Sequence, residues 1–450
     1  MASAPPQGLS PPKAAIVHGA DRKLVEAALA RLSVTGSGDW LIPGNPYAID
    51  AGKRLHSDSN AVPPLQSNDF LDYMAASAFV HCGDGWSYLG RSVDALLRGD
   101  IHAAVHLIYY AELRAAISLL ASEGIYIGNG VNLVASQAGT LEDVTRDRTH
   151  DAAWKYLATW KQGVRCSSLL GQILRPGNTS LDEWSQNIPN TSIIPMVSDL
   201  LDKMAFDLQA FVVDRTRRNT ASYNPSRIRV DDIDLHDRYK TVSQLWLALE
   251  PDTRGGFPNI DQSLLWKILT GAFSSVTKLL DEHGNLTDDT DWSAWESWLS
   301  SAVPNQSVGS PIYEEMLQAP TSLSSNALLD EVFANDVLFT SPVAYIRPMI
   351  GRTMVLLRMA TGSCILLLQE SGIGDKEIEP WVNSLGVSRG LWTTMQRPDN
   401  PLDLWQDAEL ARVEIESALA NKSHHDFSVP GAAVFVLGQT ERIIAWSFLQ

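Results

Sequence analysis

The segment DALLRGDIHAAVHLIYYAELRAAISLLASEGI, residues 94–125, carries the strongest secondary-structure signal in the chain. Between Ile101 and Ser122 it contains neither Pro nor Gly, and Ala and Leu, the best helix formers, predominate. The Asp100 side chain is suited to accept free amides of a first helical turn, and Gly124 is suited to follow the last one. The pattern therefore predicts a helix over 101–122.

One face of this predicted helix combines apolar side chains with imidazole and phenol groups, because at 100° per residue they fall on one stripe. The stripe consists of His102, His106, Tyr109, Leu113, Ala116, Ile117 and Leu120. Either the helix brings polar groups into a semi-buried cleft, or it is a core helix whose His and Tyr groups hydrogen bond to neighbouring helices. On the first interpretation, His102, His106 and Tyr110 are candidates for binding a nucleotide or RNA.

Composition sets limits on the class of protein. The 450 residues are 45% hydrophobic and 19% charged with a net charge of −17, which is typical of a globular chain with no general attraction to nucleic acid. Any such contact must come from a local basic patch. Three widely spaced cysteines predict neither a disulfide framework nor a zinc site. With no signal-peptide pattern, and with Arg352 and Arg358 interrupting the most apolar run, the chain is predicted to be cytoplasmic, with no membrane partner.

The rest of the chain favours a mainly α, multi-helix bundle without an alternating βαβ rhythm. We expect four regions: an N-terminal, partly irregular cap (1–60), a helical unit (61–175), a middle helical region (176–300) and a C-terminal helical region (301–450). Within them, a helix break is expected at Gly83–Gly85, a loop at Gly128–Gly139, and a turn and helix directly after it. Residues 193–214 and 348–371 are expected to be helical. For 33–60 and 430–450 the sequence does not decide whether a strand forms.

The pattern ALL..GD...A....YYA...AA..LL...GI resembles the opening helix pair of the HEPN superfamily, over about residues 65–165. The residues that carry it are Ala95, Leu96, Leu97, Gly99, Ala103, Tyr109, Tyr110, Ala111, Ala115, Ala116, Leu119, Leu120, Gly124 and Ile125. The resemblance implies a helical domain of prokaryotic toxin or defence systems, and a site that is completed by dimerisation.

HEPN ribonucleases pair an Arg with a His at a helix start, with four to six residues between the two. By resemblance, His150 would be the general acid or base, and Arg146 or Arg148 would stabilise charge on the phosphorane, which needs no metal. Here three residues separate Arg146 from His150 and one separates Arg148 from it, so the spacing departs from the family's. The alternative is a charged helix cap with Arg148 and Asp151 exposed.

A second basic segment supplies possible phosphate ligands. Arg215, Arg217, Arg218 and Arg227 surround Tyr223, which could stack on a base. The alternative is a solvated loop whose arginines pair with nearby acidic residues.

These features together predict an intracellular prokaryotic HEPN-like protein that binds or cleaves RNA or nucleotides in a defence or stress system. The expected partners are RNA or a nucleotide, and a protein partner or a second copy of the chain. No cofactor and no metal are expected, since the His102 and His106 pair lacks the Glu of a zinc-protease motif. The alternative function is a non-catalytic scaffold or adaptor subunit of a multiprotein complex.

Overall fold

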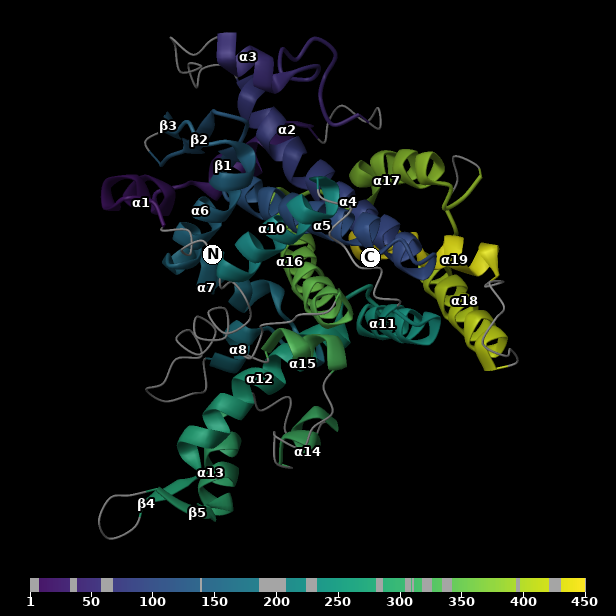
Figure 1. The fold of residues 1–450 in the computed structure, drawn as a ribbon. Helices are drawn as coiled ribbons and strands as arrows, with labels where there is room; N and C mark the ends of the chain where they lie inside the picture. The colour runs from purple at the N-terminus through teal and green to yellow at the C-terminus, as the bar shows by residue number, and fades with distance from the viewer. Residues whose placement is uncertain are drawn as a thin grey trace.

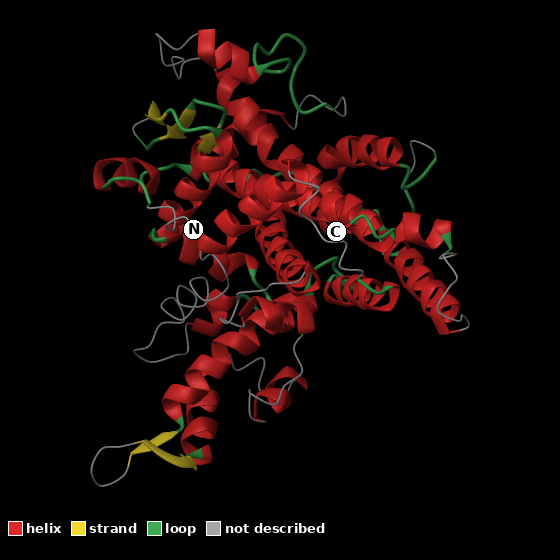
Figure 2. Ribbon diagram, in the orientation of Figure 1, coloured by secondary structure: helices red, strands yellow, loops and turns green. Residues whose placement is uncertain are grey.

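The protein is described by a computed structural model that covers most of the chain. The described residues are 8–32, 39–57, 68–137, 140–185, 208–223, 233–280, 286–303, 309, 311–317, 326–333, 342–393, 397–420 and 430–449. The fold is mainly α-helical, as predicted, and strands occur in two small antiparallel sheets of the described part (Figures 1 and 2).

Three long helices form the centre of the molecule: α4 (Asn68–Leu97), α5 (Ile101–Ser122) and α16 (Pro342–Glu370). Around them lie α1 (Pro11–His18), α2 (Arg22–Leu32), α3 (Ala51–Ser57), α6 (Thr149–Lys161), α7 (Val164–Ile173), a 3₁₀ turn η2 (Pro176–Asn178), α8 (Leu181–Ser185), α10 (Leu208–Tyr223), α11 (Leu235–Ala248), α12 (Pro258–Val276), α13 (Trp292–Ala302), α14 (Pro311–Leu317), α15 (Ala327–Phe333), α17 (Asp375–Arg389), α18 (Asp403–Ala420), α19 (Gly431–Leu437) and α20 (Arg442–Phe448). The helix predicted over 101–122 is confirmed, and both of its ends are as predicted. The Asp100 carboxylate caps it by accepting a hydrogen bond from the Ala103 amide at 3.0 Å.

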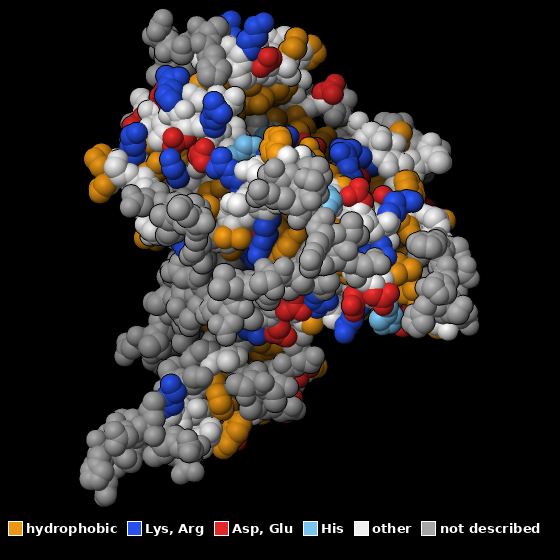
Figure 3. Space-filling model, viewed as in Figure 1, with side chains coloured by type: hydrophobic (Ala, Val, Ile, Leu, Met, Phe, Trp, Pro, Cys, Tyr) orange, Lys and Arg blue, Asp and Glu red, His pale blue; other side chains and the backbone are white. Residues whose placement is uncertain are grey.

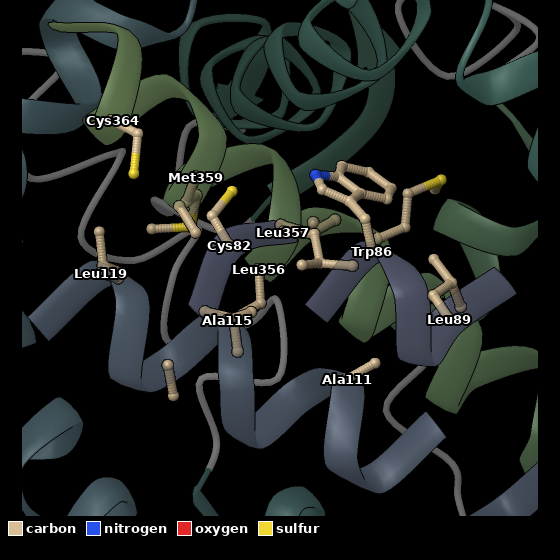
Figure 4. Close-up of a cluster of buried hydrophobic side chains, with 14 of the residues drawn as sticks. Cys82, Trp86, Leu89, Ala111, Ala115, Leu119, Leu356, Leu357, Met359 and Cys364 are labelled. Atoms are coloured by element: carbon tan, nitrogen blue, oxygen red, sulfur yellow. The ribbon is translucent and has the colours of Figure 1, made fainter. Parts of the chain in front are cut away.

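Helix α5 packs against α4 on one side and α16 on another, and small or apolar side chains fill the contact (Figure 4). Those labelled are Cys82, Trp86, Leu89, Ala111, Ala115, Leu119, Leu356, Leu357, Met359 and Cys364. The three cysteines are buried, and they form no disulfide bond in the described part of the chain. One hydrophobic cluster runs from Val17 to Leu449, so helices from all four predicted regions share a core.

Helix α4 continues without interruption through Gly83 and Gly85, so the predicted helix break is wrong. The reason is close packing: a Cβ at position 85 would lie 2.6 Å from Leu357 Cδ2 on α16 and 3.5 Å from the Ala111 carbonyl oxygen on α5. Glycine therefore allows three helices to approach at this point, where the sequence pattern suggested a turn.

The segment after α5 is a three-stranded antiparallel sheet, in place of the predicted loop and helix start. It contains β1 (Ile125–Ile127), β2 (Asn132–Ala135) and β3 (Leu141–Thr145). The Asn132 side chain, fully buried, donates to the carbonyl oxygens of Thr145 and Asp147 at 3.1 and 3.0 Å. Because this pairing joins residues 13 and 15 positions apart, local propensity does not reveal it.

Elsewhere the structure extends or corrects the expected elements. Residues 431–437 and 442–448 form helices, which resolves the choice left open for 430–450, and 39–57 contain no strand. Of the helix expected at 193–214, residues 193–207 lie outside the described part of the chain. Residues 208–214 are helical and belong to α10, which continues to Tyr223. Beyond α12 the chain forms a hairpin of β4 (Lys278–Leu280) and β5 (Leu286–Thr290) beside α13 (Figure 1).

Two described helices, α5 and the Tyr345–Glu370 part of α16, are long and apolar enough to cross a membrane by composition. In this structure 72% and 89% of their most apolar windows are buried inside the protein. Both therefore pack as core helices here, and the cytoplasmic location stays a prediction.

The contact between α4 and the turn after α19 gives a test of the packing. A Cβ on Gly90 would lie 2.3 Å from the Gly438 carbonyl oxygen and 2.9 Å from the Thr440 amide, which are backbone atoms. We expect Gly90→Ala to lower the free energy of unfolding by ~1–3 kcal/mol, because the backbone must move. Gly431→Ala, at the exposed start of α19 where a Cβ meets nothing within 4 Å, is the control and should be neutral or slightly stabilising. Urea unfolding of both variants measures this, and equal midpoints would contradict it.

Candidate functional site

Helices α5, α6 and α10 bring four side chains together, here named the Tyr-His-Arg cluster: Tyr109, Tyr110, His150 and Arg218. The Tyr109 hydroxyl lies 2.9 Å from His150 Nδ1. Arg218 Nη2 lies 3.3 Å from His150 Nε2 and donates to the Tyr110 hydroxyl at 3.1 Å. The guanidinium carbon also lies 5.2 and 5.1 Å from the centres of the Tyr109 and Tyr110 rings.

These contacts assign the proton on the imidazole. A guanidinium has only donors, so His150 Nε2 must accept from Arg218. In the neutral ring Nδ1 then carries the hydrogen and donates to the Tyr109 hydroxyl oxygen. The imidazole lone pair, the group that could take a proton from a substrate, therefore faces the arginine.

The pKa of His150 is lowered to about 4, first by burial, then by the positive charges of Arg218 and Arg215; Asp151 acts in the opposite direction. Burial likewise raises the pKa of Tyr109 to about 12. At neutral pH the cluster thus contains a neutral imidazole next to a charged guanidinium and an un-ionised phenol.

Arg218 differs from the other buried arginines because no described carboxylate balances its charge. It is 7% exposed, and its Nε has no hydrogen-bond partner among the described residues. No carboxylate among the described residues pairs with it; its remaining contacts are to Asn219, Tyr110 and His150. Each of the other arginines buried in the described part forms an ion pair with a carboxylate: Arg22, Arg352, Arg358, Arg412 and Arg442. A buried cation without an anion is costly, so this position favours binding of an external anion.

Aromatic rings extend the cluster along α5. His106 lies 4.9 Å from Tyr110 between ring centres, and Tyr88 of α4 stacks on Tyr110 at 5.6 Å. His106 Nδ1 lies 2.7 Å from the Ser222 hydroxyl on α10, and burial together with Arg218 lowers the pKa of His106. His106, Tyr110 and His150 are half-buried, whereas Tyr109 is fully buried, so the first three form the accessible edge of the cluster.

The two arginines predicted to act with His150, Arg146 and Arg148, do not contact it in the structure. Arg146, 54% exposed, pairs with Asp143 at 2.5 Å, and exposed Arg148 is the residue that precedes the first turn of α6. Neither forms a described contact with His150. The arginine that contacts His150 is Arg218, which follows it by 68 residues and was expected only as a phosphate ligand.

The other predicted ligands are mostly occupied or distant. Arg215 pairs with Asp151, and Arg217 pairs with Asp214 at 3.1 Å and lies over the Tyr345 ring. Tyr223 is 73% exposed at the end of α10. His102 is half-buried, with no hydrogen bond or ion pair to a described residue, and Arg227 lies outside the described residues. The sequence places Tyr109 on the predicted stripe but predicts its neighbour Tyr110, and not Tyr109, as a ligand.

A buried charged network holds α10 in place behind the cluster. Asp214, fully buried, accepts from Arg217 and from Arg352 of α16, and Glu112 of α5 lies 3.9 Å from Arg352. Burial and the neighbouring Asp214 raise the pKa of Glu112. Because Asp214 and Arg218 are one helical turn apart, this network anchors the part of α10 that carries Arg218.

On the face viewed in Figure 3, basic and acidic side chains are interspersed, so the drawn residues form no extended basic surface there. The described residues also contain no group of three or more His, Cys, Asp and Glu side chains placed to hold a metal ion. Comparison with known proteins gives no matching family model, no similar curated protein and no similar solved structure. The relationship to the HEPN superfamily therefore stays a prediction.

The protonation of His150 can be measured by following its ring resonances in an NMR pH titration. We expect a pKa near 4 in the wild type and a clear rise towards the ordinary value in Arg218→Gln, because a neighbouring positive charge is removed while burial remains. Arg146→Gln is the control and should leave the titration unchanged. A wild-type value near 6.5, or an unchanged value in Arg218→Gln, would contradict this electrostatic account.

Proposed function

We propose that the Tyr-His-Arg cluster binds a phosphate group of RNA or of a nucleotide. The observation that carries the proposal is Arg218, a buried guanidinium without a carboxylate partner in the described structure. A phosphate would supply the missing negative charge and accept its N–H groups in the geometry that a guanidinium prefers. Tyr110 and His106 lie at the half-buried edge, where an aromatic face could stack on a base.

The same geometry suggests cleavage without a metal. When Arg218 turns to the phosphate, His150 Nε2 is released and can take the proton of a ribose 2′-hydroxyl. The 2′ oxygen forms a bond to phosphorus, the bond to the 5′ oxygen breaks, and that oxygen takes a proton from water. Arg218 stabilises the negative charge that develops on the phosphate oxygens. The products are a 2′,3′-cyclic phosphate and a 5′-hydroxyl.

The resemblance to HEPN proteins supports the same chemistry, and with it a role in a prokaryotic defence or stress system and a homodimeric or partner-bound state. The proposal departs from that family in one respect. The arginine that acts with His150 is Arg218 of α10, and Arg146 and Arg148 take no part.

A non-catalytic adaptor is the second candidate, and one observation favours it. The polar groups of the cluster already bond to one another, and Arg215 and Arg217 already pair with Asp151 and Asp214. A network of this kind can serve only to satisfy buried polar groups between three helices. The two candidates differ in whether Arg218 binds an external anion.

The variants that separate them are Arg218→Gln, His150→Asn and the control Arg146→Gln. For a ribonuclease, we expect His150→Asn to reduce the cleavage rate ~100- to 10,000-fold with RNA binding largely kept, whereas Arg218→Gln weakens both. Arg146→Gln should behave as wild type. Cleavage of a labelled single-stranded RNA is measured beside binding at two salt concentrations, since phosphate contacts weaken as salt rises.

Thermal unfolding of each variant identifies any loss that is due to misfolding. Salt-sensitive RNA binding that depends on Arg218, with no cleavage, would leave the binding proposal and remove the catalytic one. No binding by the wild type, or binding unaffected by Arg218→Gln, would overturn both and favour the adaptor.

The pH dependence of cleavage tests the role of His150 separately. Since its folded-state pKa is about 4, the imidazole is neutral, and so able to accept a proton, at every pH above that value. We expect the acidic limb of kcat/KM, which reports the free enzyme, near pH 4. In Arg218→Gln the limb should move to higher pH. A limb near 6.5 in the wild type would exclude His150 in this environment as the base.

A further inference from the structure

A cavity of about 550 Å³ lies where the end of α7, the turn η2, the start of α12 and the C-terminal half of α16 meet. None of the residues that line it belongs to the Tyr-His-Arg cluster. Its apolar wall includes Phe257, Ile365 and Leu366, and its basic side chains are Arg175, Arg254 and Arg358. The volume is in the range that small-molecule sites occupy.

A buried ion pair forms one side of this cavity and fixes its shape. Arg358 binds Asp261 through both carboxylate oxygens, at 2.8 and 2.7 Å, and donates to the Ile173 carbonyl oxygen at 2.5 Å. Both side chains are at most 5% exposed, and the guanidinium lies 4.9 Å from the centre of the Phe257 ring. These contacts join α7, α12 and α16 before any ligand is present.

Of the two acidic residues that line the cavity, Asp261 has both carboxylate oxygens engaged by the protein and Asp252 has Oδ1 engaged. Asp261 accepts the Arg175 amide at 2.9 Å in addition to Arg358. Asp252 accepts the amides of Arg254 and Gly256 at 2.9 and 2.8 Å, which fixes the turn before α12. The charge of Asp261 is therefore compensated by the protein's own donors and that of Asp252 in part, so the two oppose an anion in the cavity less than free carboxylates would.

Several basic donors remain available by contrast. Arg358 Nη1 has no hydrogen-bond partner among the described residues, and it lies where a Cβ on Gly362, which also lines the cavity, would approach within 2.5 Å. The exposed Arg254 and Arg175 form no ion pair with a described carboxylate, and the Arg175 side chain has a single contact, to the Asn178 carbonyl oxygen at 3.3 Å. Three guanidinium groups thus surround an apolar wall.

We propose that this cavity binds a small amphiphilic anion, with its apolar chain or ring against Phe257, Ile365 and Leu366 and its carboxylate or phosphate at Arg175 and Arg254. The two exposed arginines receive the anionic group, because a guanidinium can bind a carboxylate or phosphate through two parallel hydrogen bonds. Arg358 Nη1 provides a further donor deeper in the site. This site is independent of the function proposed for the Tyr-His-Arg cluster.

The test is a calorimetric titration of the full chain with octyl phosphate and with decanoate, both below their micelle concentrations, and with inorganic phosphate as the purely polar probe. We expect the amphiphiles to bind at one site and inorganic phosphate to bind far more weakly, since it cannot use the apolar wall. The variant Arg175→Gln/Arg254→Gln should weaken octyl phosphate at least about tenfold. Leu366→Trp, which fills the cavity, should abolish binding.

Arg98→Gln, which removes an exposed arginine in the turn directly after α4, is the matched control and should bind as wild type. Melting temperatures of all variants, measured without ligand, establish that they fold. The proposal is overturned if neither amphiphile binds at millimolar concentration. It is equally overturned if folded Arg175→Gln/Arg254→Gln and Leu366→Trp bind as tightly as Arg98→Gln.

Discussion

Burial of α5 between α4 and α16 is the constraint from which the rest of the structure follows. The buried polar groups of this 22-residue helix have no access to water, so each must find a partner inside the protein or stay unpaired at a cost in free energy. Ser118 donates to the Ala78 carbonyl oxygen, Tyr109 meets His150, and Glu112 lies close to Arg352. These partners come from α4, α6 and α16, so the polar side chains of α5 determine which elements surround it.

The buried arginines differ in whether the fold supplies a carboxylate to balance their charge. Arg22 joins α2 to the end of α5 and to α16 through Glu123 and Glu370, and Arg358 joins α16 to α12 through Asp261. Each of these cations has its anion within the fold and stabilises the arrangement of helices. Arg218 occupies an equally buried position but has aromatic faces and an imidazole where the others have a carboxylate. That difference is the physical basis for proposing an anion site there.

Much of the fold could be predicted, because helix propensity and caps are local properties of the sequence. The bounds of α5 follow from Asp100, Gly124 and the lack of Pro and Gly between them. The failures share one cause. The pattern around Gly85 predicts a helix break, although this glycine permits contact with α16, and the pattern around Asn132 predicts a loop, although its side chain joins strands through the Thr145 and Asp147 carbonyls. In both cases a partner distant in sequence or in space determines the conformation.

In the candidate site, too, some features follow from the sequence and others only from the tertiary structure. The sequence by itself determined the residue types and their faces: His and Tyr on an apolar helix, His150 at a helix start, and arginines after position 214. Only the tertiary structure decided that Arg218, and neither Arg146 nor Arg148, meets His150, and that Tyr109 completes the contact. The reason is that α10 is positioned by contacts with elements distant in sequence, among them the buried pair of Asp214 with Arg352 of α16. Such a pair contributes nothing to local sequence periodicity and exists only when the helices are packed.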